Sequence, residues 1–192
     1  MKLTVLGPGC WGLTLAWLMN DNFEDIVIWG RECDLNDDLV INKHCSKPLE
    51  VQLDKKVQIT SDLKKAIEGA DIILSVVATG GVRPVCEQLK AAGIKPETPL
   101  VNASKGLELN TLMRMSEVIK DVLPEQKVVI LSGPTLAKEV LMRKPTAASV
   151  ACEDIETAEF VQKACNVPNR FRLLYAKFVC NSMSYVRLPL RS

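Results

Sequence analysis

The first twelve residues constrain the fold more than any other stretch, because three glycines separate two apolar runs there. Residues 2–6 are rich in β-forming side chains, and Gly7, Gly9 and Gly12 follow at G-x-G-x-x-G spacing. Residues 13–19 are typical of a buried helix. A strand, a tight turn and a helix in this order favour a dinucleotide-binding βαβ unit, with an ordinary βα turn as the alternative.

Each glycine has a separate expected role in such a turn. Gly7 allows the sharp bend, Gly9 lets the backbone approach a diphosphate, and Gly12 lets the helix pack closely on the strand. The unpaired amides and the positive end of the helix dipole then attract the diphosphate.

Strand-like and helix-like segments alternate along the rest of the chain. Strands are expected at residues 2–6, 25–29, 57–59, 71–77, 99–102, 127–131, 146–151 and 171–175. Helices are expected at residues 13–19, 82–92, 112–122, 134–142 and 154–164, with a further one that Ser61 or Asp62 caps and that runs to residue 68. Residues 35–53 lack a clean period and indicate a loose helix and loop. This alternation predicts an α/β fold with a doubly wound, mostly parallel, Rossmann-like sheet.

Ligands of such sheets bind outside the carboxyl ends of the strands. Gly7, Arg31, Ala78, Lys105 and Gly133 all follow predicted strand ends, so we expect them to line one crevice.

Two residues bear on the nucleotide expected in that crevice. Arg31 follows the second strand, where a guanidinium can pair with a 2′-phosphate and so favours NADPH. Glu32 favours NADH by its spacing from Gly12, and an exposed Arg–Glu pair without a ligand is the third possibility. Trp11 can cover the dinucleotide with its ring or pack in the core.

Two later turns carry candidate substrate groups. Lys105 can polarise a carbonyl or hold a phosphate, although a solvated loop lysine is equally consistent with its position. Gly133 suggests an unusual turn, after which Pro134 is expected to start a helix and Thr135 to direct its hydroxyl at the crevice.

Charge and composition argue against several classes of protein. Lys and Arg total 24 against 23 Asp and Glu, so the net charge of +1 offers no attraction for nucleic acid. No apolar run reaches the roughly 18 residues of a membrane span, and no signal peptide is expected before the first strand. Seven cysteines without a C-x-x-C pair indicate free thiols in the cytoplasm, and His44 is expected in a polar surface loop.

A set of short motifs resembles one enzyme family, NAD(P)-dependent glycerol-3-phosphate dehydrogenase, over residues 1 to about 172. The motifs are GPGCWGLTLA (7–16), TSDL (60–63), GADIIL (69–74), SKGLE (104–108), LSGPTLAKE (131–139) and PTA (145–147). The glycine fingerprint alone is common, whereas the SKGLE and SGPT segments together are specific to the family.

The resemblance implies reduction of dihydroxyacetone phosphate to sn-glycerol 3-phosphate, a phospholipid precursor, with NADPH or NADH as cofactor. Carried over by position and joined to the three glycines, the expected cofactor contacts are Gly7, Gly9, Cys10, Trp11, Gly12, Arg31, Lys105 and Ala137. The expected substrate contacts are Lys105, Gly133 and Thr135.

The chain departs from the family pattern at residues 49–53 and after residue 172. In the family a helical substrate domain follows, and its lysine is the general acid/base; counting from Phe171, Pro189 stands at that position. We therefore expect a dinucleotide-binding domain at 1–172, a divergent tail at 173–192, and little or no turnover, because general acid catalysis typically contributes about 10²–10⁴-fold.

Two other functions remain open. One is a non-catalytic nucleotide-binding or interaction module that forms a homo-oligomer through exposed apolar surface. The other is a different NADP-dependent ketone reductase of the hydroxyacid or ketopantoate type.

Overall fold

The first strand, β1 (Lys2–Leu6), lies inside the sheet and pairs in parallel with a strand on each side in the computed structural model. Its neighbours are β2 (Asp25–Trp29) and β6 (Ile72–Ser75). All three strands are buried on both faces, mostly through apolar side chains, which suits a parallel sheet covered by helices on both sides. The structure describes residues 1–177.

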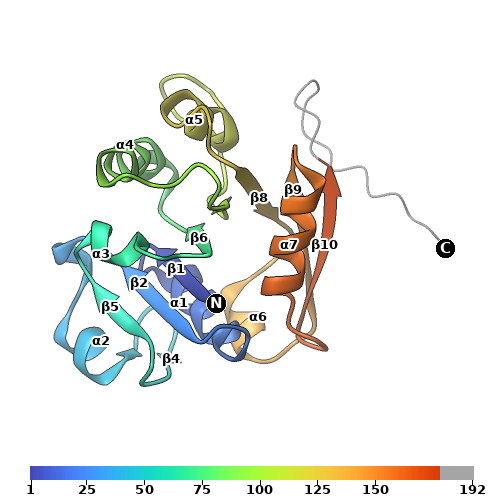
Figure 1. The fold of residues 1–192 in the computed structure, drawn as a ribbon. Coiled ribbons are helices and arrows are strands. Elements are labelled where there is room, and N and C mark those ends of the chain that lie inside the picture. The colour runs from blue at the N-terminus through green and yellow to red at the C-terminus, as the bar shows by residue number, and fades with distance from the viewer. Residues whose placement is uncertain (178–192) are drawn as a thin grey trace.

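The sheet has eight strands in the order β10-β9-β8-β7-β6-β1-β2-β5 (Figure 1). The remaining strands are β5 (Gln58–Thr60), β7 (Leu100–Asn102), β8 (Val128–Ser132), β9 (Thr146–Cys152) and β10 (Phe171–Lys177). Every neighbouring pair is parallel except β8 with β9, so β9 and β10 run opposite to the other strands. The predicted doubly wound, mostly parallel sheet is confirmed, while the reversal at β9 was not predicted.

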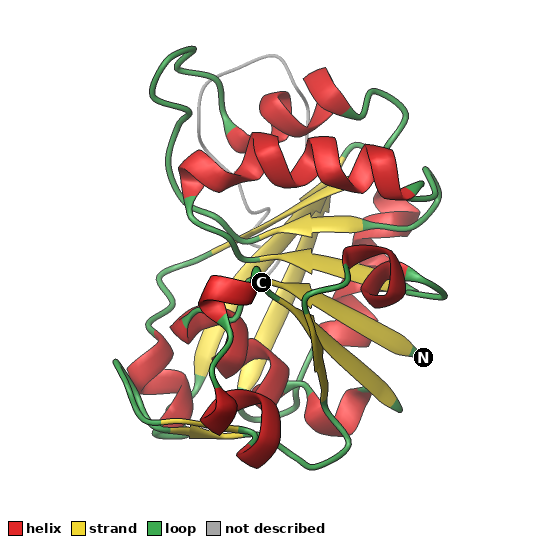
Figure 2. Cartoon of the chain, turned by 90° about the vertical axis from the view of Figure 1, so that its left-hand side faces the viewer, coloured by secondary structure: helices red, strands yellow, loops and turns green. Residues whose placement is uncertain are grey.

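Helices cover both faces of this sheet (Figure 2). One buried cluster joins the sheet to α1 (Cys10–Leu18), α6 (Ala137–Leu141) and α7 (Ile155–Cys165). The other joins it to α3 (Leu63–Ile67), α4 (Val82–Ala92) and α5 (Met115–Val122). The carboxyl edge of the parallel strands is thereby left to loops.

The helix ends follow from local chemistry. The carboxylate of Asp62 accepts a hydrogen bond from the amide of Lys65 at 3.0 Å and caps α3. Asp154 caps α7 in the same way through Glu156. Gly93 ends α4 with a φ of 77°, a conformation that glycine adopts without steric cost. These boundaries match those predicted from the sequence.

Three predicted helix starts are wrong, and the strand expected at residues 71–77 is shorter, at Ile72–Ser75. The helix expected from residue 112 begins at Met115, because Leu112 adopts a left-handed φ of 58°. The helix expected to start at Pro134 begins at Ala137, because the amide of Thr135 bonds back to the carbonyl of Gly133 at 2.9 Å. The first helix begins at Cys10, three residues before the predicted start.

Residues 35–53 form more structure than the loose helix and loop that we expected. They contain α2 (Asp37–Asn42) and a hairpin of β3 (His44–Cys45) and β4 (Val51–Gln52). Two-residue strands produce no readable alternation, so the hairpin gave no signal in the sequence.

Strand β10 crosses residue 172, where the domain division was expected, and that division stays a prediction. Pro189 and Cys180 lie outside the described residues. Among residues 1–177, no helix has the length and apolar character needed to cross a bilayer.

Candidate functional site

The glycine turn connects β1 to α1 through very close backbone contacts. Gly7 has a φ of +109°, and a Cβ atom there would lie 2.9 Å from the carbonyl oxygen of Val76. A Cβ at Gly12 would lie only 2.1 Å from the carbonyl oxygen of Gly7. A Cβ at Gly9, in contrast, would meet nothing within 4 Å. Gly7 and Gly12 therefore form the turn, while Gly9 faces open space.

The start of α1 leaves backbone donors available next to that open space. The first α-helical hydrogen bond runs from the amide of Leu13 to the carbonyl of Gly9 at 2.9 Å. The amides of Cys10, Trp11 and Gly12 precede it and have no partner within the helix. Gly9 supplies no side-chain cap. These amides and the positive end of the helix dipole can bind an anion.

A second close contact, which the sequence reasoning missed, fixes the turn from the β2 side. A Cβ at Gly30 would lie 2.7 Å from Cγ of Pro8 and 2.9 Å from a methyl carbon of Leu35. The amide of Gly7 also donates to the carbonyl of Trp29 at 2.8 Å. Pro8 therefore packs on the chain just after β2. Only the strand pairing brings these residues together, so the sequence carried no local sign of the contact.

The glycine turn opens onto a cleft at the carboxyl edge of the sheet. Four segments line this cleft: the start of α1, the loop after β6, the loop after β7 and the segment before α6. The lining residues are Gly9, Cys10, Trp11, Val76, Val77, Ala78, Thr79, Ala103, Ser104, Lys105, Thr135, Leu136 and Ala137. The structure thus brings together Gly9, Cys10, Trp11, Lys105, Thr135 and Ala137 from the residues predicted to form a site.

Lys105 extends across this cleft toward the segment after β8. Its Nζ lies 3.4 Å from the carbonyl oxygen of Gly133. Gly7, Arg31 and Gly133 do not line the cleft themselves, so the single crevice expected for all the strand ends is wrong for these three residues. The Lys105 ammonium nevertheless joins the loops that follow β7 and β8.

Gly133 is required for a different reason from the one we expected. Its φ is not in the left-handed region, and a Cβ there would lie 2.9 Å from Cα of Ala148 and 3.0 Å from the carbonyl oxygen of Ala147. The glycine therefore allows β9 to approach, a role that we did not predict, and the tight turn that follows it is the backbone bond from Thr135 to Gly133. Thr135 is almost fully buried and lines the cleft.

Arg31 lies outside the cleft lining, on the far side of the glycine turn. Its guanidinium binds the carboxylate of Asp34 through two hydrogen bonds of 2.7 and 2.9 Å. This contact holds the pKa of Asp34 below its usual value. The Arg31 side chain is 68% exposed, so it remains accessible to an anion that competes with Asp34.

Cys10 and Trp11 form the wall next to the glycine turn. Burial raises the pKa of the Cys10 thiol, although the hydrogen bond with Thr14 acts in the opposite direction. Trp11 is partly buried and packs against the core while one side lines the cleft. Trp11 therefore packs in part against the core, as one of the two alternatives expected, and its covering of a dinucleotide stays a prediction.

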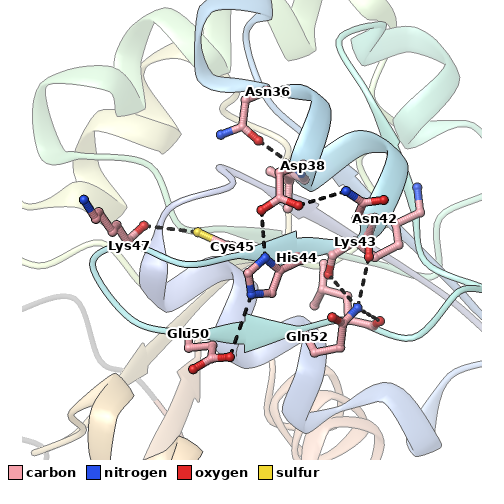
Figure 3. A network of polar contacts seen from close by, with 11 residues as sticks. Asn36, Asp38, Asn42, Lys43, His44, Cys45, Lys47, Glu50 and Gln52 are labelled. Carbon is pink, nitrogen blue, oxygen red and sulfur yellow. Dashed lines mark hydrogen bonds and ion pairs between the residues drawn. The ribbon is translucent and has the colours of Figure 1, made fainter.

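His44 belongs to a polar network that joins α2 to the hairpin (Figure 3). Its Nδ1 lies 2.7 Å from Oδ2 of Asp38, and its Nε2 lies 3.9 Å from Oε1 of Glu50. The polar surface loop expected for His44 is wrong, because the residue lies in β3 and is half-buried. No cluster of potential metal ligands is found within residues 1–177.

Comparison with known proteins gives a consistent result. Residues 2–158 match the family model described as NAD-dependent glycerol-3-phosphate dehydrogenase N-terminus. The chain is 40% identical over 177 residues to a glycerol-3-phosphate dehydrogenase [NAD(P)+] of Bacillus pumilus, covering 90% of this chain and 50% of that protein. It is 39% identical over 179 residues to the protein of the same name from Thermoanaerobacter, covering 93% of this chain and 53% of that protein.

Solved structures show the same fold. A glycerol-3-phosphate dehydrogenase from Coxiella burnetii superimposes with a TM-score of 0.80 at 25% identity, over 91% of this chain and 53% of that chain. One from Plasmodium falciparum gives a TM-score of 0.81 at 23% identity, over 92% of this chain and 52% of that chain. The chain thus spans about half the length of the relatives that it matches.

Proposed function

This chain belongs to the NAD-dependent glycerol-3-phosphate dehydrogenase family, and from that premise we propose that it binds NADPH or NADH across the glycine turn and the adjoining cleft. The observation that carries the proposal is the space at Gly9, where nothing lies within 4 Å of a Cβ position. A diphosphate placed there meets the first amides of α1 and the positive end of the helix dipole.

The same cleft offers groups for a small phosphorylated ketone. Lys105 contributes a positive charge beside the Gly133 carbonyl, and Thr135, two residues further along the same segment, also lines the cleft. We propose dihydroxyacetone phosphate as the substrate and sn-glycerol 3-phosphate as the product. The bound reduced nicotinamide would supply the hydride. Lys105 would hold the phosphate or polarise the substrate carbonyl.

Low turnover by the chain alone is part of this proposal. Reduction of a ketone produces an alkoxide that requires a proton donor. Lys105 and Cys10 are the ionisable side chains among the described residues that line the cleft. The raised pKa of Cys10 makes its thiol a weaker acid. Because Lys105 is assigned to holding the ligand, the Cys10 thiol is the remaining proton donor among these residues, and the cleft is better suited to binding than to rapid proton transfer.

Cofactor preference, ligand class and compartment follow as further proposals. The exposed Arg31 fork beside the turn supports NADPH over NADH, because it can exchange Asp34 for a 2′-phosphate. The net charge of +1 supports a small-molecule ligand rather than nucleic acid. Every cysteine among residues 1–177 is a free thiol, which supports a cytoplasmic setting.

Calorimetric titration with NADPH tests the binding proposal. Replacing Lys105→Ala should weaken binding by about tenfold or more, since a hydrogen bond to a charged group is worth about 1.5–3 kcal/mol. Lys90→Ala, an exposed lysine on α4 away from the cleft, is the matched control and should leave the affinity unchanged. Absence of binding at millimolar NADPH would refute the proposal.

A ketone panel followed by NADPH fluorescence tests the substrate. We expect NADPH to be oxidised slowly when dihydroxyacetone phosphate is the ketone. Preference for a hydroxyacid precursor or for ketopantoate would instead indicate a different reductase on the same fold.

Exposed apolar side chains favour a second candidate function, a self-associating module. Five of the exposed apolar side chains lie either in the loop that carries Lys105 or at the two ends of α6: Leu107, Leu109, Leu112, Leu136 and Met142. Leu109 is the most exposed of them at 90%, and several exposed apolar side chains gathered in one region can form a self-association surface. A monodisperse monomer in light scattering would count against this candidate, while a dimer that dissociates in Leu109→Ser would support it.

A further inference from the structure

The loop that carries Lys105, residues 103–114, connects β7 to α5 and is tied at two separate places. The first tie joins the start of the loop to the segment after β6. The Ser104 hydroxyl donates to the carbonyl of Val77 at 2.6 Å, and the Thr79 hydroxyl donates to the carbonyl of Lys105 at 2.6 Å. These two bonds fix the backbone at Ser104 and Lys105, where the loop borders the cleft.

The second tie joins the loop to α4, three residues after Lys105. Nε and one terminal nitrogen of Arg83 donate to the two carboxylate oxygens of Glu108, at 2.8 and 2.9 Å. The Thr111 hydroxyl also donates to Glu108 at 2.5 Å. The side chains of Arg83 and Glu108 are only 27% and 16% exposed. A two-pronged ion pair in such a setting is stronger and more rigid than a surface pair.

The same arginine reaches a second helix. Its other terminal nitrogen donates to Asp121 on α5, and α4 and α5 lie side by side above the sheet (Figure 1). Arg83 therefore links both helices to the loop through one guanidinium. Its contact with Asp121 does not touch the loop, so this contact can be removed separately.

The backbone between the two ties is adaptable. Gly106 has a φ of +113°, and it is the residue between Lys105 and the segment that Glu108 anchors. A glycine at this point imposes little direction of its own on the chain. The direction of Lys105 therefore depends on both anchors rather than on the stiffness of the loop.

We propose that Arg83 and Glu108 are positioning residues that hold Lys105 in the geometry needed to bind the phosphate-bearing ligands of the cleft. The proposal rests on the proposed nucleotide-binding function. It adds two residues outside the cleft lining to the set that determines affinity. A purely structural role for the ion pair is the alternative, and it predicts that Lys105 is not involved.

A double-mutant cycle on NADPH affinity separates these two roles. Glu108→Gln keeps the size of the side chain and removes its charge. We expect it to raise the NADPH Kd by about fivefold, within the range of coupling between contacting groups. In the Lys105→Ala background, the same change should leave Kd unaltered. Equal effects in the two backgrounds would overturn the proposal.

Two further variants serve as controls. Asp121→Asn removes the charge from the other contact of Arg83 while leaving the Glu108 pair intact, and it should not change Kd. Arg83→Lys keeps the charge but loses the planar fork, so it should weaken binding in the same direction as Glu108→Gln. A larger effect of Asp121→Asn than of Glu108→Gln would contradict the proposal.

Amide hydrogen exchange of the ligand-free chain gives a second readout. Faster exchange confined to residues 103–110 in Glu108→Gln is expected, with unchanged exchange in β1 and β2. Unchanged exchange in the loop would overturn the proposal. Lack of NADPH binding by the unaltered chain would overturn the proposed function and this inference together, whereas binding with additive effects would overturn the inference alone.

Discussion

The two walls of the cleft are held by different forces. On one side, Gly7, Gly12 and Gly30 allow backbone segments to approach so closely that a single added carbon collides with its neighbours. On the other side, the Lys105 loop is fixed by side-chain hydrogen bonds and an ion pair. The first wall should therefore respond to steric changes, and the second to charge and pH.

The largest expected effect comes from Gly12→Ala in the first wall. The new Cβ would lie 2.1 Å from the Gly7 carbonyl oxygen, so the turn must shift. Overpacking of this kind costs about 3 kcal/mol, which for a domain of this size lowers Tm by about 10 °C. Calorimetry measures the effect. Gly9→Ala is the control; it should leave Tm nearly unchanged and weaken NADPH binding instead.

A smaller steric effect is expected for Gly133→Ala, between the two walls. Its Cβ would lie 2.9 Å from Cα of Ala148, which can move only with β9. We expect a loss of about 2 kcal/mol in the free energy of unfolding, measured in urea. A loss as large as that of Gly12→Ala would show that the two glycines are equally constrained. An unchanged free energy of unfolding would show that β9 can move away from the new Cβ at little cost.

Arg31→Ala tests the nucleotide preference without affecting the fold. Its pair with Asp34 is exposed, so the free energy of unfolding should change by less than about 1 kcal/mol. Binding of NADPH should weaken by about tenfold, since a charge-assisted contact is lost, while binding of NADH should stay the same. Asp34→Asn frees the guanidinium and should strengthen NADPH binding. Equal losses for both nucleotides would argue against a 2′-phosphate contact.

The smallest effect, and one specific to the second wall, is a change in acid stability. The Arg83 contact, followed by that of Thr111, lowers the pKa of Glu108 to about 2. A lowered carboxyl pKa stabilises the fold above the ordinary value near 4.5, and this stabilisation is lost as pH falls toward 2.

The measurement compares Tm of the unaltered chain and of Glu108→Gln at several pH values. The difference in Tm between them should therefore be present at pH 7 and shrink between about pH 4.5 and 2. A difference in Tm that stays constant down to pH 2 would contradict stabilisation by the charge of Glu108. The lowering of Tm by Gly12→Ala should persist over the same pH range, because its cause is steric.

The elements that the sequence predicted well are those with a local cause. Strands β1 and β2 were located correctly, because uninterrupted apolar runs mark strands buried on both faces. Helix α4 was also correct, since a glycine marks its end. The hairpin of residues 44–52 and the late start of α6 were missed, because neither has a period or a cap that can be read locally.

The candidate site divides in the same way. Gly9, Cys10, Trp11, Lys105 and Thr135 were identified from turn spacing and family motifs, and they do line one cleft. Gly30 was missed, and Arg83 and Glu108 were not recognised as a pair. Arg83 and Glu108 are 25 residues apart, and the contact of Gly30 with Pro8 spans two strands.

The sequence by itself determined most of the strands and helices and the glycine turn, because backbone conformation and apolar periodicity are local properties, and its short motifs determined the family resemblance. Tertiary structure alone decided the reversed direction of β9, the close approach of β9 that requires a glycine at position 133, and the ion pair that anchors the Lys105 loop. Each of these depends on which distant segments lie against one another. Such contacts are set by the packing of the whole sheet and its helices, and no stretch of neighbouring residues encodes them.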